Sequence, residues 1–213
     1  MDVDIALLLA QDGITNGAIY ALLALALVLA FTVTRVIFIP QGEFVAYGAL
    51  TLVAVQAGRM PGTVWLLLVA GAAVVLIEAV QAMRSRAWRR FAWVAVWNAG
   101  YPLALWLLLR AVPIANFPMP LQILVALAIV VPLGPMVYRL AFQPMAEAPV
   151  LNLLICAVAV HVVMVGLGLL VFGAEGARTP PFTEGNVAIG ALSASAQTVW
   201  VVACSVALIV VLY

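Results

Sequence analysis

The chain has 213 residues, of which 68% are hydrophobic and only 8% are charged, and its formal net charge is +1. This composition lies far outside the range of soluble domains and indicates an integral membrane protein with no separate soluble domain. The charge leaves no basic face to neutralise a run of phosphates, so we expect the lipid bilayer, and no nucleic acid, as its surroundings.

The basic residues restrict the chemistry further, because all nine are arginine and none is lysine. The chain therefore has no lysine for an ATP-binding P-loop and none for a Schiff base. No pair of Cys or His has the spacing of metal ligands, and no Ser/His, HExxH or paired-carboxylate arrangement occurs. We expect no enzyme, no metal and no cofactor in this chain, and an ATP-driven transporter built on it needs its motor on another subunit.

The apolar runs predict an all-α, polytopic helix bundle with about seven transmembrane helices, because about twenty apolar residues cross a hydrocarbon core. The predicted spans are residues 14–34, 43–58, 63–83, 91–109, 121–138, 150–172 and 197–213. We treat residues 1–213 as one transmembrane domain. The second span is short and lies between Gly42 and Gly58, so we expect it to be tilted, broken or shielded by neighbours. The acidic N-terminus predicts a short lead-in helix that is amphipathic or partly inserted.

Arginine distribution predicts the orientation. The densest cluster, in MRSRAWRR, lies within residues 84–90 and is assigned to the cytoplasm. Alternation then places Arg35 and Arg139 on the same side, and the N-terminus in the periplasm. The Gly- and Pro-rich polar segment 172–197 becomes the largest external element.

Two polar clusters interrupt the first apolar runs. Asn16, Gly17 and Tyr20 open the first, and Asn16 and Tyr20, at i and i+4, share a helix face. Gln41-Gly42-Glu43 opens the second, where a helix N-terminus favours the negative charge. Each cluster has two interpretations: ordinary helix packing or an interfacial helix start, and a face that lines or gates a translocation path.

Two further ionisable residues lie inside predicted spans. Glu78, with Gln81, Arg84 and Arg86 after it, is expected to reach Gln81 or an arginine near the cytoplasmic end of its span. His161 lies near the middle of the sixth span, where it could relay protons or hydrogen-bond as a neutral ring across a helix interface; we favour the second.

The pattern NGxxYALxALxLxLxFxxxRVIxxxQGEF, residues 16–44, resembles the first two spans of the branched-chain amino acid ABC transporter permeases of the LivH/LivM type. Where that family usually has Asn-Phe-Ala, this chain has Phe38-Ile39-Pro40. The segments YRLAFQPMAEAPVLNLLI and LGLLVFGAEGARTPP resemble later passages of the same family, in the same order. The family usually continues beyond the position of Tyr213 into a cytoplasmic coupling helix, so we expect the domain to be incomplete.

The resemblance implies an inner-membrane permease subunit of an ABC importer, which forms part of the path for branched-chain or related amino acids. It implies three partners: a second permease subunit, homologous or identical, cytoplasmic ABC ATPase subunits that use ATP, and a periplasmic solute-binding protein. The path would include Asn16, Gly17, Tyr20 and Gln41 to Glu43. The alternatives are a non-transporting structural or assembly protein, a permease remnant, and an ion-coupled secondary transporter.

Overall fold

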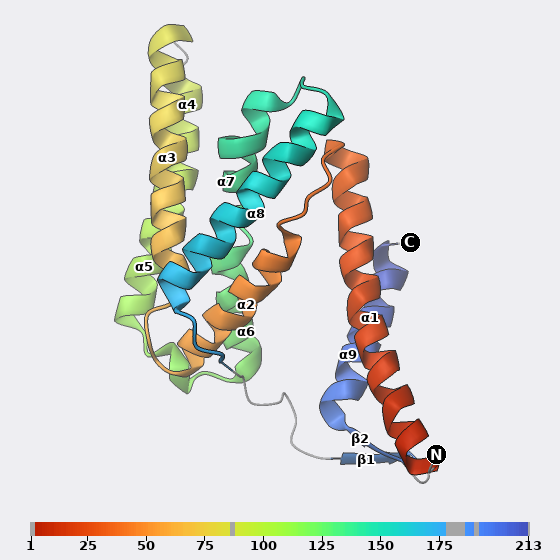
Figure 1. Ribbon diagram of the computed structural model, residues 1–213. Coiled ribbons are helices and arrows are strands. Elements are labelled where there is room, and N and C mark those ends of the chain that lie inside the picture. The colour runs from red at the N-terminus through yellow and green to blue at the C-terminus, as the bar shows by residue number, and fades with distance from the viewer. Residues whose placement is uncertain (1–2, 86–87, 178–185, 190–191, 213) are drawn as a thin grey trace. The chain divides into compact units, whose positions relative to one another are not determined.

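The computed structural model describes residues 3–85, 88–177, 186–189 and 192–212, and it confirms an all-α helix bundle (Figure 1). The first helices are α1 (Val3–Thr34), α2 (Gln41–Gln56), α3 (Gly62–Ser85), α4 (Trp88–Ala95), the π-helix η1 (Val96–Gly100) and α5 (Tyr101–Ala111). They are followed by the 3₁₀-helix η2 (Ile114–Asn116), α6 (Met119–Val130), α7 (Leu133–Val137), the π-helix η3 (Tyr138–Phe142), the 3₁₀-helix η4 (Gln143–Met145), α8 (Val150–Phe172) and α9 (Ala196–Leu212).

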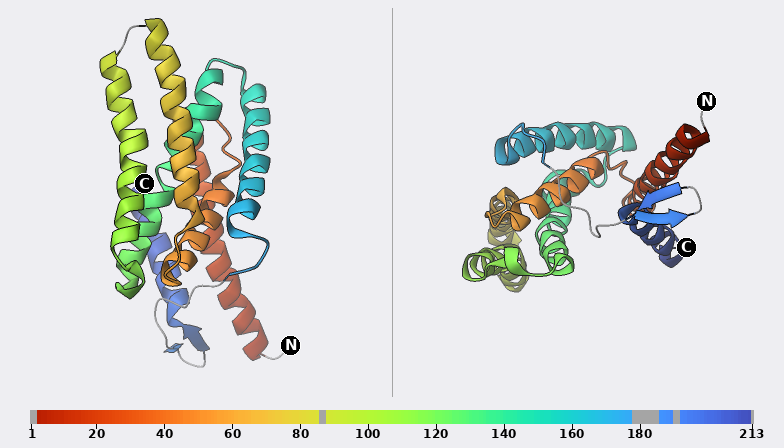
Figure 2. Two further views of the ribbon diagram at one scale, coloured as in Figure 1. Left: turned by 90° about the vertical axis from the view of Figure 1, so that its left-hand side faces the viewer. Right: turned by 90° about the horizontal axis from the view of Figure 1, so that it is seen from below.

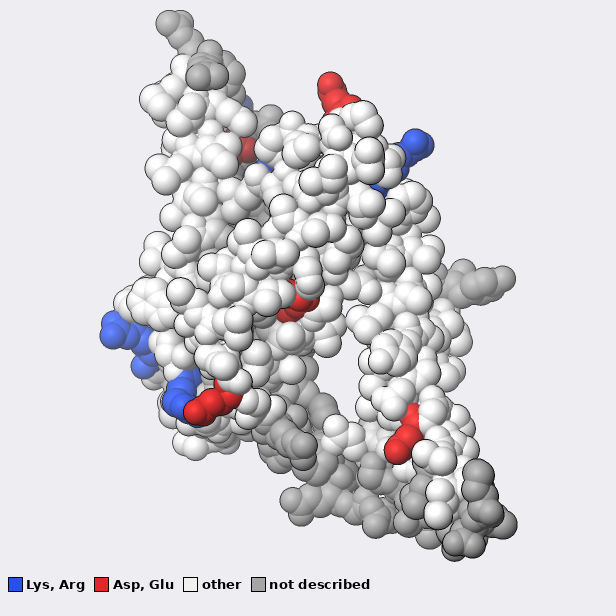
Figure 3. Space-filling model, in the orientation of Figure 1, with Lys and Arg blue, Asp and Glu red and all other residues white. Residues whose placement is uncertain are grey.

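Five helices among the described residues are long and apolar enough to cross a membrane, which identifies a membrane protein. They are Leu9–Thr34, Gly62–Met83, Phe91–Ala111, Met119–Met145 and Val150–Phe172. The apolar helix Ala196–Val211 is shorter, and α2 has only 16 residues. Broad areas of the face in Figure 3 carry no charged side chain, as the composition predicts. The predicted lead-in helix is not a separate element, because α1 runs without a break from Val3.

The chain divides into two compact units, which are described separately. The first unit comprises Met1–Phe38 and Pro180–Tyr213, and in it α1 packs against α9. It also holds a short antiparallel hairpin of β1 (Asn186–Ile189) and β2 (Leu192–Ser195), with Asn186 opposite Ser195. The sequence analysis described residues 172–197 as a Gly- and Pro-rich external segment and did not predict these strands.

The second unit comprises Ile39–Thr179 and has its own apolar core. In it, α3 runs beside the continuous helix α4–η1–α5, and α2 packs against α6 and α8 (Figure 2). The core is made of aliphatic side chains and one tyrosine from these helices and α7, among them Tyr47, Val64, Leu67, Ile129, Leu133 and Met164. Membrane helices associate through this kind of close van der Waals packing.

Hydrogen bonds from side-chain hydroxyl groups connect the helices of the second unit. The hydroxyl groups of Thr51 and Thr63, both fully buried, lie 2.7 Å apart and join α2 to α3. The hydroxyl of Tyr101 donates to the carbonyl of Ala128 at 2.7 Å and joins α5 to α6. Such bonds satisfy polar groups that lipid cannot.

Helix breaks inside the spans were not visible in the apolar pattern. In η1 the side-chain amide of Asn98 donates to the backbone carbonyl of Val94 at 2.8 Å. This bond gives the carbonyl a partner at the point where the π-turn interrupts the regular backbone hydrogen bonds of the helix. Gly71 of α3 faces this turn so closely that a Cβ there would overlap the carbonyl oxygen of Asn98. The π-turn and the glycine together bring two helix backbones into contact.

Both α1 and α2 are followed by a residue with a positive φ angle, which marks the end of the helix. Arg35 follows α1 with φ 56°, in the left-handed region. Gly58 follows α2 with φ 66°; its N–H bonds the carbonyl of Val55, and the N–H of Arg59 bonds that of Ala54. This is a Schellman motif, which ends a helix sharply.

Candidate functional site

The polar cluster at the second span opens α2, as its composition suggested. The helix begins at Gln41, after Pro40, and the N–H of Glu43 bonds the carbonyl of Pro40 at 3.0 Å. Glu43 therefore lies in the first turn of α2, where the unpaired N–H groups and the helix dipole stabilise a carboxylate. Its side chain is 17% exposed, so most of its water has been removed.

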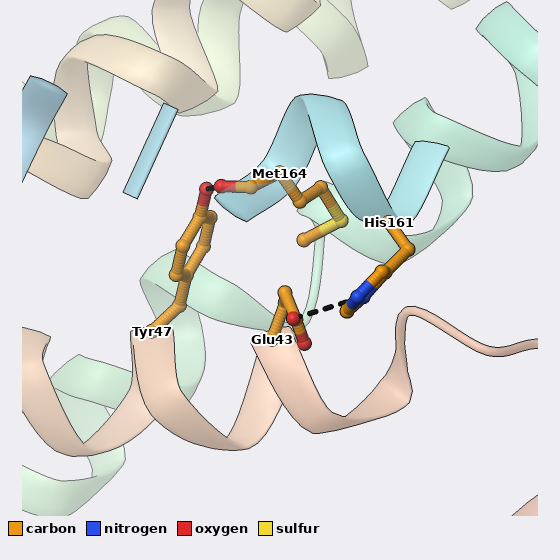
Figure 4. A network of polar contacts seen from close by, with 4 residues as sticks. All are labelled: Glu43, Tyr47, His161 and Met164. Carbon is orange, nitrogen blue, oxygen red and sulfur yellow. Dashed lines mark hydrogen bonds and ion pairs between the residues drawn. The ribbon is translucent and has the colours of Figure 1, made fainter. Parts of the chain in front are cut away.

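Glu43 meets His161 of α8 across the helix interface (Figure 4). Oε1 of Glu43 lies 2.9 Å from Nδ1 of His161, an atom that is itself shielded from solvent. Nδ1 has no hydrogen-bond partner among the described residues, so the contact is electrostatic, and it is an ion pair when the ring is protonated. The sequence analysis expected a polar partner for His161 on another helix; it did not identify Glu43.

A second tie between the same helices lies one turn further along. The hydroxyl of Tyr47 donates to the backbone carbonyl of Met164 at 2.6 Å (Figure 4). Glu43 and Tyr47 are at i and i+4 on α2, and His161 and Met164 are at i and i+3 on α8, so each pair shares a helix face. This spacing was the available signal for Tyr47, which the sequence analysis did not single out.

Tyr47 and Met164 also line an open apolar cavity of about 510 Å³ within the second unit; Val69 and Val163, which line it too, are exposed. The rest of its wall comes from α3, α7, η3 and α8 and consists of alanine, valine and leucine, with Cys156 at one side. The volume lies in the range of cavities that bind small molecules. A half-buried acid and imidazole thus lie one helical turn from a cavity with an aliphatic lining.

The predicted site residues fall into two groups. Gln41, Gly42 and Glu43 lie together in the first turn of α2, in the second unit. The other group lies on α1, in the first unit, and all its members are exposed: Asn16, Gly17 and Tyr20. A common path through both groups remains a prediction. Among the described residues, no other segment comes within 4 Å of a Cβ built on Gly17 or Gly42, so no close approach seen in the structure requires either glycine.

Within the described ranges, no three His, Cys, Asp or Glu side chains gather in a way that could hold a metal ion. Comparison with known proteins gives no matching family model, no matching curated protein and no matching solved structure. The functional assignment therefore depends on the residues and their geometry.

Proposed function

We propose that the chain is a permease subunit of an ABC importer that forms part of the path for branched-chain or related amino acids. One observation carries the proposal: the Glu43–His161 contact lies a helical turn from an aliphatic cavity. The acid belongs to Gln41-Gly42-Glu43, one of the motifs on which the resemblance to these permeases rests. The same motif thus supports the proposal in sequence and in geometry.

The chemistry of the site fits a zwitterion with an apolar side chain. The carboxylate of Glu43 can accept N–H bonds from an ammonium group, and the imidazole of His161 can donate to a carboxylate. The neighbouring cavity offers an aliphatic branch a wall of alanine, valine and leucine instead of water. Leucine, isoleucine and valine combine these three groups in one small molecule.

The proposal includes the partners that the resemblance implies. A chain without lysine needs separate ATPase subunits to use ATP, and these would bind at the cytoplasmic face, with residues 84–90 on that side. A second permease subunit would complete the path, and a periplasmic binding protein would deliver the solute. The location would be the bacterial inner membrane.

Uptake measurements on two matched tryptophan variants test the proposal. Ala70 lines the cavity, whereas Ala72, two residues along α3, is exposed and does not line it. The chain, co-expressed with its ATPase and binding-protein partners, is reconstituted in liposomes, and ATP-dependent uptake of radiolabelled leucine is measured. We expect Ala70→Trp to abolish uptake and Ala72→Trp to preserve it, with equal amounts of folded protein.

The alternatives give other results. Failure to co-purify with any ATPase, together with absent uptake, would favour a structural or assembly protein or a permease remnant. Uptake that stops with an uncoupler while ATP is maintained would indicate an ion-coupled transporter. Equal uptake by the two tryptophan variants would remove the cavity from the path.

A further inference from the structure

A second, polar pocket lies in the same unit and has no part in the site described above. Its volume is about 190 Å³, and it is lined by α3 and by the π-helix η3 with its continuation η4. Two of its polar residues, Glu78 and Gln81, belong to α3. The other two, Arg139 and Gln143, come from η3 and η4. We refer to it as the Arg139 pocket.

Arg139 brings a buried donor to this pocket that the protein does not satisfy. Its Nη1 atom is shielded from solvent and has no hydrogen-bond partner among the described residues. An unsatisfied buried donor is unfavourable, and more so when it carries charge. Arg139 also lies in a π-helix, a rare turn that occurs often at functional sites. The unsatisfied donor is explained if an anionic group binds the guanidinium.

Glu78 gives the pocket a charge of the opposite sign. Its side chain is only 7% exposed, so the carboxylate is held inside the bundle. A carboxylate has about four acceptor positions, so an ammonium group can bind beside the contact that Glu78 already makes within the protein. A purely anionic ligand would bring its charge next to Glu78, whereas a ligand with both charges matches both residues.

We propose that the Arg139 pocket binds a zwitterion, with an anionic oxygen group at Arg139 and an ammonium group at Glu78. The volume is below that of pockets for drug-sized ligands, so the occupant is a small molecule or a headgroup. Phosphoethanolamine, the headgroup of phosphatidylethanolamine, has both groups, and so does a free amino acid. The side-chain amides of Gln81 and Gln143 are placed to contact either.

The position of the pocket favours the lipid. Glu78 lies one to two turns before the end of the apolar helix Gly62–Met83, and Arg139 a similar distance before the end of Met119–Met145. The predicted orientation puts these helix ends on the cytoplasmic side, where basic pockets between membrane helices bind lipid headgroups. This inference does not depend on the proposed transport function, because it concerns different residues and a different ligand contact.

Native mass spectrometry of the delipidated full chain in detergent tests the proposal. The probes are short-chain phosphatidylethanolamine, short-chain phosphatidylglycerol, which lacks the ammonium group, and free leucine. The variants are Arg139→Gln, Glu78→Gln and, as a control, Arg59→Gln, since Arg59 is exposed and lies in the loop after α2. Arg139→Lys keeps the positive charge but loses the planar guanidinium, which can form two parallel hydrogen bonds. It replaces Arg139→Gln in the experiment if that variant does not fold.

We expect phosphatidylethanolamine to bind more tightly than phosphatidylglycerol. Arg139→Gln should weaken its binding about tenfold or more, as expected for a lost charged hydrogen bond. Arg139→Lys should weaken it less, and Arg59→Gln should leave it unchanged. Glu78→Gln should abolish the preference over phosphatidylglycerol. Leucine that displaces the lipid in an Arg139-dependent way would support the same chemistry with a free amino acid as the source.

Two results would overturn the proposal. The first is equal binding of the two lipids to the unmodified chain, which would remove the role of Glu78. The second is an equal effect of Arg139→Gln and Arg59→Gln, which would reduce the site to general attraction by arginine. If leucine uptake is absent while lipid binding still depends on Arg139, the proposed transport function is wrong and the proposed lipid site stands.

Discussion

The ring of Tyr47 lies directly on Gly168. A Cβ added to Gly168 would be 3.1 Å from Cε1 of Tyr47, closer than an ordinary van der Waals contact. Beyond the glycine, the same ring meets Phe172 with 5.7 Å between centroids. α8 therefore carries a small residue where the aromatic ring of α2 crosses it, and this contact holds the hydroxyl against Met164.

The first prediction concerns the volume at this crossing. Gly168→Val forces the ring of Tyr47 away and should lower the free energy of unfolding by about 1–3 kcal/mol, the range for overpacking. Gly166→Val is the matched control, because no other part of the described chain comes within 4 Å of a Cβ built there. Thermal unfolding in detergent measures both variants. Equal melting temperatures would contradict the packing described for Tyr47.

The second prediction concerns the hydroxyl of Tyr47. Tyr47→Phe keeps the ring contacts and removes the bond to the carbonyl of Met164, so it should destabilise the protein by about 0.5–1.5 kcal/mol. Tyr20→Phe is the control, since Tyr20 is 70% exposed. Unfolding by denaturant in detergent measures the difference between the two. Equal stability of the two variants would mean that the hydroxyl of Tyr47 makes no net contribution to the free energy of unfolding.

The third prediction concerns the buried hydroxyl pair. Thr51→Val or Thr63→Val alone leaves the other hydroxyl without its partner and should destabilise the protein by about 1–2 kcal/mol. The double variant should lose less than the sum of the two, with a coupling energy of about 0.5–1 kcal/mol. A double-mutant cycle measures the coupling directly. Strictly additive losses would show that the two hydroxyl groups do not interact.

The fourth prediction concerns Arg35, whose φ of 56° suits glycine better than a residue with a Cβ. Arg35→Gly should maintain or raise stability, by up to about 1 kcal/mol. Arg35→Val places a β-branched residue in the same conformation and should lower it by about 1–2 kcal/mol. Melting temperatures of the two variants rank them. The opposite order would contradict the left-handed end of α1.

The sequence predicted the helical segments because apolar run length and the breaks at Pro and Gly are local properties. The short second span and its end at Gly58 were found in this way. The breaks inside spans, η1 and η3, were missed, since a π-turn depends on neighbours such as Gly71. The paired strands β1 and β2 were also missed, because a polar, Gly-rich segment gives a weak strand pattern.

The candidate site was predictable only in part, for a related reason. The position of Glu43 at a helix start follows from the polar cluster Gln41-Gly42-Glu43, which directly precedes an apolar run. Its contact with His161 depends on the crossing of α2 and α8, which no pattern within either segment specifies. The orphaned donor of Arg139 likewise depends on what surrounds it in three dimensions.

Because α2 is short, we expect the stability of the fold to depend on the thickness of the bilayer. Its 16 residues rise about 24 Å, whereas a hydrocarbon layer is about 30 Å thick. Val45 on this helix is 56% exposed, so part of α2 faces the surroundings of the bundle. A bilayer beside it must thin, or water must reach one of its ends, and each costs energy that rises with bilayer thickness. Lipids with shorter acyl chains should therefore suit the fold better than long-chain lipids.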